Sequence, residues 1–241
     1  MSTAAILVIG NEILSAKVQD ENGPFLAREL RGLGVELRRI ETVPDEVPLI
    51  VDALRRSLSQ AQWVFTSGGV GPTHDDVTIA AVSQAFGRAV VLDERTLQLL
   101  RSHFGDPLKP ALRRLAEVPE GSRLEFHEGY LFPVISLENV VILPGVPSLL
   151  REGFLRIRDR FRVAPFHSKA LYFTIGEGAL AEHLDATVAR FPAVAIGSYP
   201  RFDPADHRVK VTFDGRDAAQ VRSACEFLKA RLPAGVIVRE E

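Results

Sequence analysis

The sequence predicts an α/β protein in which a doubly wound, mainly parallel sheet is followed by a small α+β domain of the βαββαβ type. Two observations support this prediction. Apolar runs that suit strands alternate with helical patterns through most of the chain, which favours right-handed crossovers and helices on both faces of one sheet. From His167 onward the order changes to strand, helix, strand, strand, helix, strand, which is the order of a ferredoxin-like unit.

The first strand is expected at residues 4–9, a continuous apolar run (AAILVI) that is typical of a strand covered on both faces. A helix is expected from Asn22, with Pro24 in its first turn and Gly34 at its end. Residues 35–43 then alternate between apolar and polar side chains, as in a second strand. These elements begin the strand-helix-strand series of the sheet.

Asp45 is placed to cap the next helix, in which Ile50, Leu54 and Leu58 share one face. The same alternation predicts the rest of the larger domain: a strand at 63–66, helices at 79–86 and 96–104, a surface loop at 107–110, strands at 130–137 and 139–143, and a helix from Pro147 towards Phe161. A turn at residues 138–139 makes the last two strands a hairpin, so part of the sheet is expected to be mixed.

The smaller domain is expected to contain strands at 169–175, 193–199, 208–213 and 235–238, and helices at 177–190 and 217–232. The segment 163–166, which contains Pro165, separates the alternating strands and helices of the larger domain from the βαββαβ order of the smaller one. We therefore expect a larger domain at residues 1–165 and a ferredoxin-like domain at residues 166–241.

Composition excludes several classes of protein. The 241 residues are 46% hydrophobic and 25% charged, which is enough to build a core. The net charge of -2 argues against a nucleic-acid partner held by its phosphate backbone. Cys225 is the single cysteine, so no intramolecular disulfide or cysteine-based zinc site is expected. No stretch is apolar enough to span a bilayer, and no basic leader begins the chain, so we expect a cytoplasmic protein with no membrane partner.

The stretch TSGGVGPTHDDVT, at residues 66–78, lies between a predicted strand and a predicted helix. Gly68, Gly69 and Gly71 would let the backbone approach a ligand closely, and free amides at the helix end attract anions. A phosphate is therefore expected against residues 68–73, where a side chain at Gly69 would occupy the space that the anion needs. The stretch lacks the lysine of a P-loop and the spacing of a dinucleotide fingerprint.

Asp75 and Asp76 are adjacent carboxylates at the same end of this stretch. Beside a phosphate they make sense chiefly if a divalent metal neutralises both charges. The alternative is that Asp76 only caps the helix and that the glycines only turn the chain. The spacing of the residues does not decide between these two interpretations.

Two other predicted strand ends carry candidate residues. Asn11 and Glu12 follow the first strand, and Gly145 lies in LPGVP after a later one. Because ligands of open α/β sheets bind outside the carboxyl ends of the strands, these loops are expected to converge on one crevice. Glu12 would then add an oxygen ligand or position a water molecule. Its alternative role is that of a solvated turn residue, and Asp45 is either a further candidate or a plain helix cap.

The motifs TSGGVGPTHDDVT, GNEIL and LPGVP together resemble the molybdopterin-binding family of molybdenum-cofactor biosynthesis, in the form used by competence/damage-inducible protein A. Four more segments are similar to the amino-terminal domain of eukaryotic FAD synthase: VPDEV, FHSK, GSYP and LKARLP. The resemblance covers nearly the whole chain. It implies a molybdopterin-binding-like domain at residues 1–165.

The resemblance further implies a metal-dependent pyrophosphohydrolase that acts on ADP-ribose or FAD with Mg, Mn, Co or Ni. Asp76 would be the metal-associated residue, with Gly68, Gly69, Gly71 and Thr73 as the phosphate loop. Asn11 stands where some relatives carry aspartate, which removes a possible ligand. The alternatives are molybdopterin binding or adenylyl transfer with the same loop, and a nucleotide-binding protein without turnover. A homodimer is expected, because symmetric dimers are the commonest assemblies.

Overall fold

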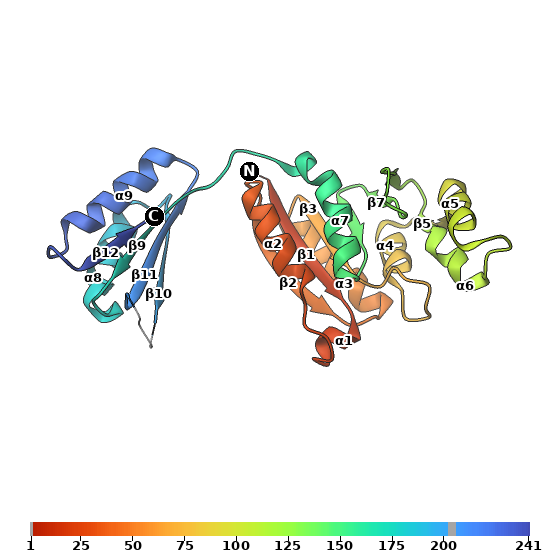
Figure 1. Cartoon of the computed structure of the whole chain (residues 1–241), viewed down its shortest axis with the longest axis horizontal. Helices are drawn as coiled ribbons and strands as arrows, with labels where there is room; N and C mark the ends of the chain where they lie inside the picture. Colours follow the sequence, from red (N-terminus) through yellow and green to blue (C-terminus); the bar gives the residue numbers. More distant parts are fainter. Residues whose placement is uncertain (1, 202–205) are drawn as a thin grey trace. The chain divides into compact units, whose positions relative to one another are not determined.

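The computed structural model describes residues 2–201 and 206–241, and the chain divides into two units, Met1–Val163 and Ala164–Glu241 (Figure 1). Each unit has its own sheet and its own hydrophobic core. No helix in these described residues has both the length and the apolar character that a membrane crossing requires.

The first unit is built on a six-stranded sheet in the order β2-β1-β3-β8-β7-β6. Strands β2, β1, β3 and β8 are parallel, whereas β7 and β6 run antiparallel to their neighbours. The predicted doubly wound, mainly parallel sheet with a late hairpin is therefore confirmed. The strands are β1 (Thr3–Ile9), β2 (Glu36–Val43), β3 (Trp63–Ser67), β6 (Arg123–Glu125), β7 (Val134–Leu137) and β8 (Val140–Leu143).

Helices cover both faces of this sheet, which explains the continuous apolar run of β1. Ile6 and Val8 pack into the core beneath α2 (Asn22–Gly32) and α7 (Pro147–Ile157). Leu7 and Ile9 instead point into a second core with α3 (Val47–Gln60) and α4 (Thr78–Phe86). Successive side chains of a strand point to opposite faces, so a strand with helices on both sides needs apolar residues at every position.

A lobe that the sequence predicted only in part lies between α4 and β6. We call it the helical lobe, residues 90–119. It contains β4 (Val90–Leu92), α5 (Glu94–Phe104), α6 (Pro110–Arg113), the 3₁₀ helix η1 (Arg114–Ala116) and β5 (Glu117–Pro119), with β4 and β5 paired antiparallel. Leu97, Leu100, Leu108 and Ala116 form its own small core.

Two sequence-based expectations near this lobe are wrong in detail. The loop expected at 107–110 ends in the first residue of α6, and the strand expected from Tyr130 begins only at Val134. Three strands here, β4, β5 and β6, are each three residues long. Three residues are too few to show a periodicity, so the sequence does not reveal such strands. They form because each pairs with a neighbouring strand.

The second unit is a four-stranded antiparallel sheet in the order β10-β11-β9-β12. The chain passes through β9 (His167–Phe173), α8 (Glu177–Arg190), β10 (Ala195–Pro200), β11 (Val209–Gly215), α9 (Ala218–Ala230) and β12 (Ile237–Glu240). This is the predicted βαββαβ succession, and β12 pairs with β9 in the same sheet. The carboxylate of Asp217 caps α9 by accepting hydrogen bonds from the amides of Ala219 and Gln220.

A close contact on α7 gives a test of packing in the first unit. A Cβ atom on Gly153 would lie 2.7 Å from the hydroxyl oxygen of Tyr130, which donates a hydrogen bond to Leu149 O. We expect Gly153→Ala to destabilise this unit by about 1–3 kcal/mol, because a packed core resists an added methyl group. Urea unfolding followed by the fluorescence of Trp63, the single tryptophan, measures this cost.

Two further variants control this experiment. Gly32→Ala adds the same methyl group to α2 at a place where nothing beyond the adjoining backbone of the helix lies within 4 Å, so the stability of the protein should stay equal or rise slightly. Adding Tyr130→Phe to Gly153→Ala removes the crowded oxygen and should restore part of the loss. A Gly153→Ala protein as stable as Gly32→Ala would contradict the contact.

Candidate functional site

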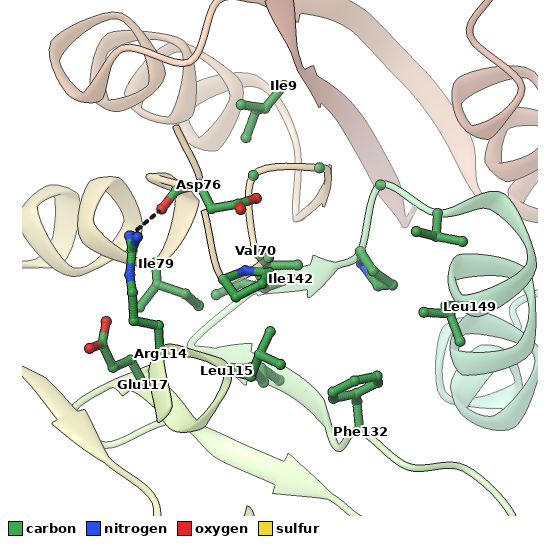
Figure 2. Close-up of a pocket in the computed structure, with 18 of the residues that line it drawn as sticks. Ile9, Val70, Asp76, Ile79, Arg114, Leu115, Glu117, Phe132, Ile142 and Leu149 are labelled. Carbon is green, nitrogen blue, oxygen red and sulfur yellow. Dashed lines mark hydrogen bonds between the residues drawn. The ribbon is translucent and has the colours of Figure 1, made fainter. Parts of the chain in front are cut away.

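A cavity of about 540 Å³ opens at the carboxyl ends of β1, β3 and β8, where these strands face the helical lobe (Figure 2). The structure brings most of the predicted site residues to it: Glu12, Gly68, Gly69, Gly71, Asp75, Asp76 and Gly145 all line the cavity. Thr73 lies in the same loop but not on the cavity wall. A second hollow next to the cavity shares Glu12, Asp45 and Asp75 with it.

The loop after β3 needs its first two glycines for its own conformation. Gly68 and Gly69 have φ angles of 101° and 66°, in the region that favours glycine. A Cβ atom on Gly68 would collide with Ile9 O, and one on Gly69 would collide with the Thr78 hydroxyl, which donates to Gly68 O at 2.8 Å. The expectation that a Gly69 side chain would fill the space of an anion is therefore wrong, because that side chain would point at α4.

Asp76 does not cap α4, so the capping interpretation is wrong. The helix begins at Thr78, and its N-cap is Val77, with no hydrogen bond from a side chain. Asp76 Oδ2 instead accepts hydrogen bonds from the amide of Thr73, at 2.8 Å, and from the Thr73 hydroxyl. Gly71 leaves room for this carboxylate, because a Cβ atom there would lie 2.6 Å from Asp76 Oδ2. Asp76 thus closes the turn that carries it.

Asp75, the neighbouring carboxylate, is exposed and lines both hollows. The Thr73 side chain, and to a smaller extent the backbone of Asp75 itself, hold the pKa of this carboxyl below its ordinary value. Asp75 is therefore ionised at neutral pH. The two adjacent aspartates differ in environment, since Asp76 is engaged within the turn and Asp75 faces solvent.

Asp45 also differs from its predicted role as a helix cap. The N-cap of α3 is Glu46, and Asp45 Oδ2 accepts a hydrogen bond of 2.8 Å from the amide of Asn11. Asn11 begins the short helix α1 (Asn11–Leu14), whose second residue is Glu12. The Glu12 carboxylate lies over Gly10, since a Cβ atom on that glycine would come within 2.5 Å of Oε1. Both Asp45 and Glu12 line the cavity.

Sequence reasoning missed two residues that hold the loops of the cavity together. Asn22, buried in the first turn of α2, donates through Nδ2 to Ser67 Oγ at 2.9 Å and to Gly145 O at 2.7 Å. Gly145 can pack closely there, since its Cβ position is 3.2 Å from the Cα atom of Gly68. Arg114 of the helical lobe donates to the backbone oxygen of Thr73 and to that of Asp76, and Figure 2 shows the second of these hydrogen bonds. Neither residue belongs to a recognisable motif.

The cavity is rich in negative charge. Glu12, Asp45, Asp75, Asp76 and Glu117 line it, and Arg114 is the one basic side chain on its wall among the residues that the structure describes. An anionic ligand would meet repulsion from these five carboxylates, which a bound cation would reduce.

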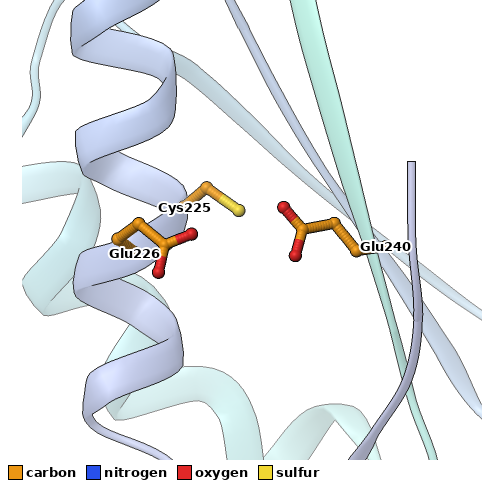
Figure 3. A group of neighbouring side chains, drawn as sticks. All are labelled: Cys225, Glu226 and Glu240. Atoms are coloured by element: carbon orange, nitrogen blue, oxygen red, sulfur yellow. The ribbon is translucent and has the colours of Figure 1, made fainter.

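Within residues 2–201 and 206–241, the one group of three potential metal ligands with closely spaced atoms lies in the second unit (Figure 3). It consists of Cys225, Glu226 and Glu240. Lys169 and Lys229 bind the Glu240 carboxylate at 2.7 and 2.8 Å, and these contacts hold its pKa below the ordinary value. This group is an ion-pair network with its charge already compensated. The carboxylates of the cavity, by contrast, form no preassembled cage of three.

The thiol of Cys225 beside this network should be unreactive. Its side chain is fully buried on α9, and burial raises the pKa of the thiol to about 11. We expect dithionitrobenzoate at pH 8 to label Cys225 only after unfolding in urea, because the thiolate is the reacting species. Labelling of the native chain at the rate of a free thiol would contradict the buried position.

Two family models match the chain, one for each unit. Residues 5–162 match a model described as a probable molybdopterin binding domain, which accounts for well over half of the chain. The chain belongs to the molybdopterin-binding domain family. Residues 165–241, which follow this molybdopterin-binding domain, match the middle domain of FAD synthase.

Relatives and a solved structure agree with this family. A probable FAD synthase of Caenorhabditis elegans is 32% identical over 98% of this chain and 51% of its own length. A CinA-like protein of Gemmatimonas aurantiaca is 35% identical over 85% of this chain and 52% of its own. The chain thus spans about half the length of these two relatives. A CinA protein of unknown function from Thermoplasma acidophilum superposes with a TM-score of 0.62, at 28% identity over 66% of this chain and 98% of that one.

Proposed function

We propose that this protein is a metal-dependent pyrophosphohydrolase that cleaves an adenine dinucleotide, ADP-ribose or FAD, in the cavity of its molybdopterin-binding domain. One observation carries the proposal: a single cavity combines a glycine loop, a set of carboxylates and an apolar wall. The similarity to FAD synthases supports an adenine nucleotide as the ligand.

The glycine loop is the part of the cavity that suits a diphosphate. In the described part of the chain, the amides of Gly69, Val70 and Gly71 have no acceptor in the protein, whereas the amide of Gly68 is bound to Leu143 O. Three successive free amides on a loop without large polar side chains offer hydrogen bonds to phosphate oxygens. The same amides would stabilise negative charge that develops on those oxygens during hydrolysis.

The apolar wall suits the flat ring systems of such a ligand. Six apolar side chains from different strands, helices and loops of the domain line the cavity (Figure 2): Val70, Ile79, Leu115, Phe132, Ile142 and Leu149. Ligand pockets are mostly apolar, with a few polar groups that fix orientation. An aromatic ring such as that of Phe132 also offers a stacking surface to a heterocycle.

The carboxylates fit a divalent cation. Ions such as Mg²⁺ are held by one or two carboxylates together with substrate phosphates, so a cage of three protein ligands is not required. Asp75 and Asp76 would hold the ion at the end of the glycine loop. Bound there, Mg, Mn, Co or Ni supplies charge neutralisation and an activated water. Glu12 faces the same cavity and would orient the attacking water by accepting its proton in a hydrogen bond.

The test is a screen of ADP-ribose, FAD and NAD, each with Mg²⁺, Mn²⁺, Co²⁺ or Ni²⁺, in which AMP release is followed by liquid chromatography. We expect AMP from at least one dinucleotide, and we expect EDTA to abolish its release. Absence of AMP in every combination would contradict the hydrolase.

The family match favours a second candidate, in which the same cavity binds molybdopterin or transfers an adenylyl group to it. Calorimetric titration with molybdopterin species in the same screen distinguishes the two, since tight binding without dinucleotide hydrolysis supports the second candidate. A nucleotide-binding protein without catalysis would bind a dinucleotide and leave it intact.

The homodimer and the cytoplasmic location expected from the sequence stay predictions. Light scattering at micromolar concentrations tests the first, and a monomeric mass throughout would contradict it. Fractionation of cells that express the protein tests the second.

A further inference from the structure

Arg114 has no part in the proposed chemistry, although its guanidinium lies on the wall of the cavity (Figure 2). One nitrogen donates to Thr73 O, and the other donates to Asp76 O at 3.2 Å. The two oxygens begin and end one turn, which also contains Asp75. A single side chain from the helical lobe therefore holds both ends of the segment that presents the two candidate metal ligands.

This turn has few other attachments. Thr73, His74 and Asp75 are exposed, and Asp76 is only half buried, so no side chain of the turn is anchored in a core. The hydrogen bonds from Thr73 to the Asp76 carboxylate join the turn to itself and not to the rest of the domain. The position of the turn relative to the cavity consequently depends on a contact from outside, and Arg114 makes one.

The backbone of Arg114 is well placed to supply such a contact. Ala116, two residues later, is fully buried in the core of the helical lobe, and Ala116 O accepts a 2.8 Å hydrogen bond from the amide of Asp93. Leu115 packs against the same core. The planar guanidinium can bind two oxygens at once in a fixed geometry, which a lysine ammonium on a flexible stem cannot reproduce.

We infer that Arg114 is a positioning residue, whose two hydrogen bonds place the Asp75 and Asp76 carboxylates and so set the affinity of the cavity for a divalent cation. The part of this inference that concerns the cation rests on the proposed function. The part that concerns the turn rests only on the contacts of Arg114.

Hydrogen-exchange mass spectrometry on the full chain tests whether the two hydrogen bonds from Arg114 fix the turn at residues 73–76. We compare the wild type with two variants. Arg114→Gln removes both the charge and the planar guanidinium, whereas Arg114→Lys keeps the charge and removes the guanidinium. Arg113→Gln, at the exposed neighbouring position, is the matched control. We expect peptides that cover residues 71–77 to exchange roughly 10-fold faster in both Arg114 variants and unchanged in the control.

The second measurement is Mn²⁺ binding followed by electron paramagnetic resonance. We expect both Arg114 variants to bind Mn²⁺ about 5- to 10-fold more weakly, with an unfolding temperature within about 3 °C of the wild type. Wild-type affinity in Arg114→Lys would show that charge alone matters and would overturn the positioning role, as would unchanged exchange in both variants. A wild type that binds no Mn²⁺ contradicts the metal site of the proposed function, and the exchange result then decides the hold on the turn by itself.

Discussion

Replacing Asp76 with asparagine is expected to lower metal-dependent dinucleotide hydrolysis roughly 100-fold or more and to leave the fold intact. The remaining side-chain oxygen of asparagine can still accept both hydrogen bonds from Thr73, so the turn keeps its shape. The lost charge, however, is the one that a divalent cation needs at the end of the glycine loop. AMP release at limiting metal and urea unfolding on the same preparation separate these two effects.

Two variants control the Asp76→Asn experiment. Asp52→Asn removes one carboxylate from the exposed face of α3, away from the cavity, and should leave hydrolysis unchanged. Thr73→Val keeps the Asp76 charge and removes one of its hydrogen bonds, so it should loosen the turn with a smaller loss of turnover. Full activity of Asp76→Asn at limiting metal would restrict this carboxylate to closing the turn.

Replacing Gly68 with alanine is expected to destabilise the first unit by about 3 kcal/mol or more. Two effects combine at this position. The φ angle of 101° is one that residues with a side chain rarely adopt, and the added Cβ atom would collide with Ile9 O, a backbone atom at the end of β1, an interior strand of the sheet. The colliding atom belongs to the backbone, so no side-chain rotation can relieve the clash. A shift of either backbone segment would disturb the sheet. Trp63 fluorescence during urea unfolding measures the effect in this unit.

Gly87→Ala isolates the conformational part of this cost. Gly87 ends α4 with a φ angle of 63° and has open space where a Cβ atom would be. Alanine there should cost only about 1–2 kcal/mol, the penalty of the left-handed conformation. Equal losses in Gly68→Ala and Gly87→Ala would contradict the collision with Ile9 O.

The stability that Gly68→Ala is expected to lose limits the use of glycine substitutions for locating a ligand at this loop. Substitutions at Gly68 or Gly69 change the loop itself, because their Cβ atoms point at the protein. Weaker ligand binding in such variants therefore does not locate an anion. Asp76→Asn is a better probe of the site, because asparagine can keep both hydrogen bonds from Thr73 and so leaves the conformation of the loop unchanged.

The sequence by itself determined the architecture of both units. The unbroken apolar run of β1 required helices on both faces, and the changed rhythm after His167 required a separate sheet. It also located the ends of β1, β3 and β8, which place Glu12, Asp76 and Gly145 around one cavity. These features follow from local periodicity and from the rule that parallel strands present their carboxyl ends at one edge.

Only the tertiary structure decided what the polar side chains do there. The sequence allowed Asp45 and Asp76 to be helix caps, yet each carboxylate binds a different backbone amide. Asn22 and Arg114 act on partners 45 and 41 residues away, Ser67 and Thr73. The three-residue strands β4 and β5 exist because each pairs with the other. A hydrogen bond depends on a distance and an angle in space, and sequence separation carries neither.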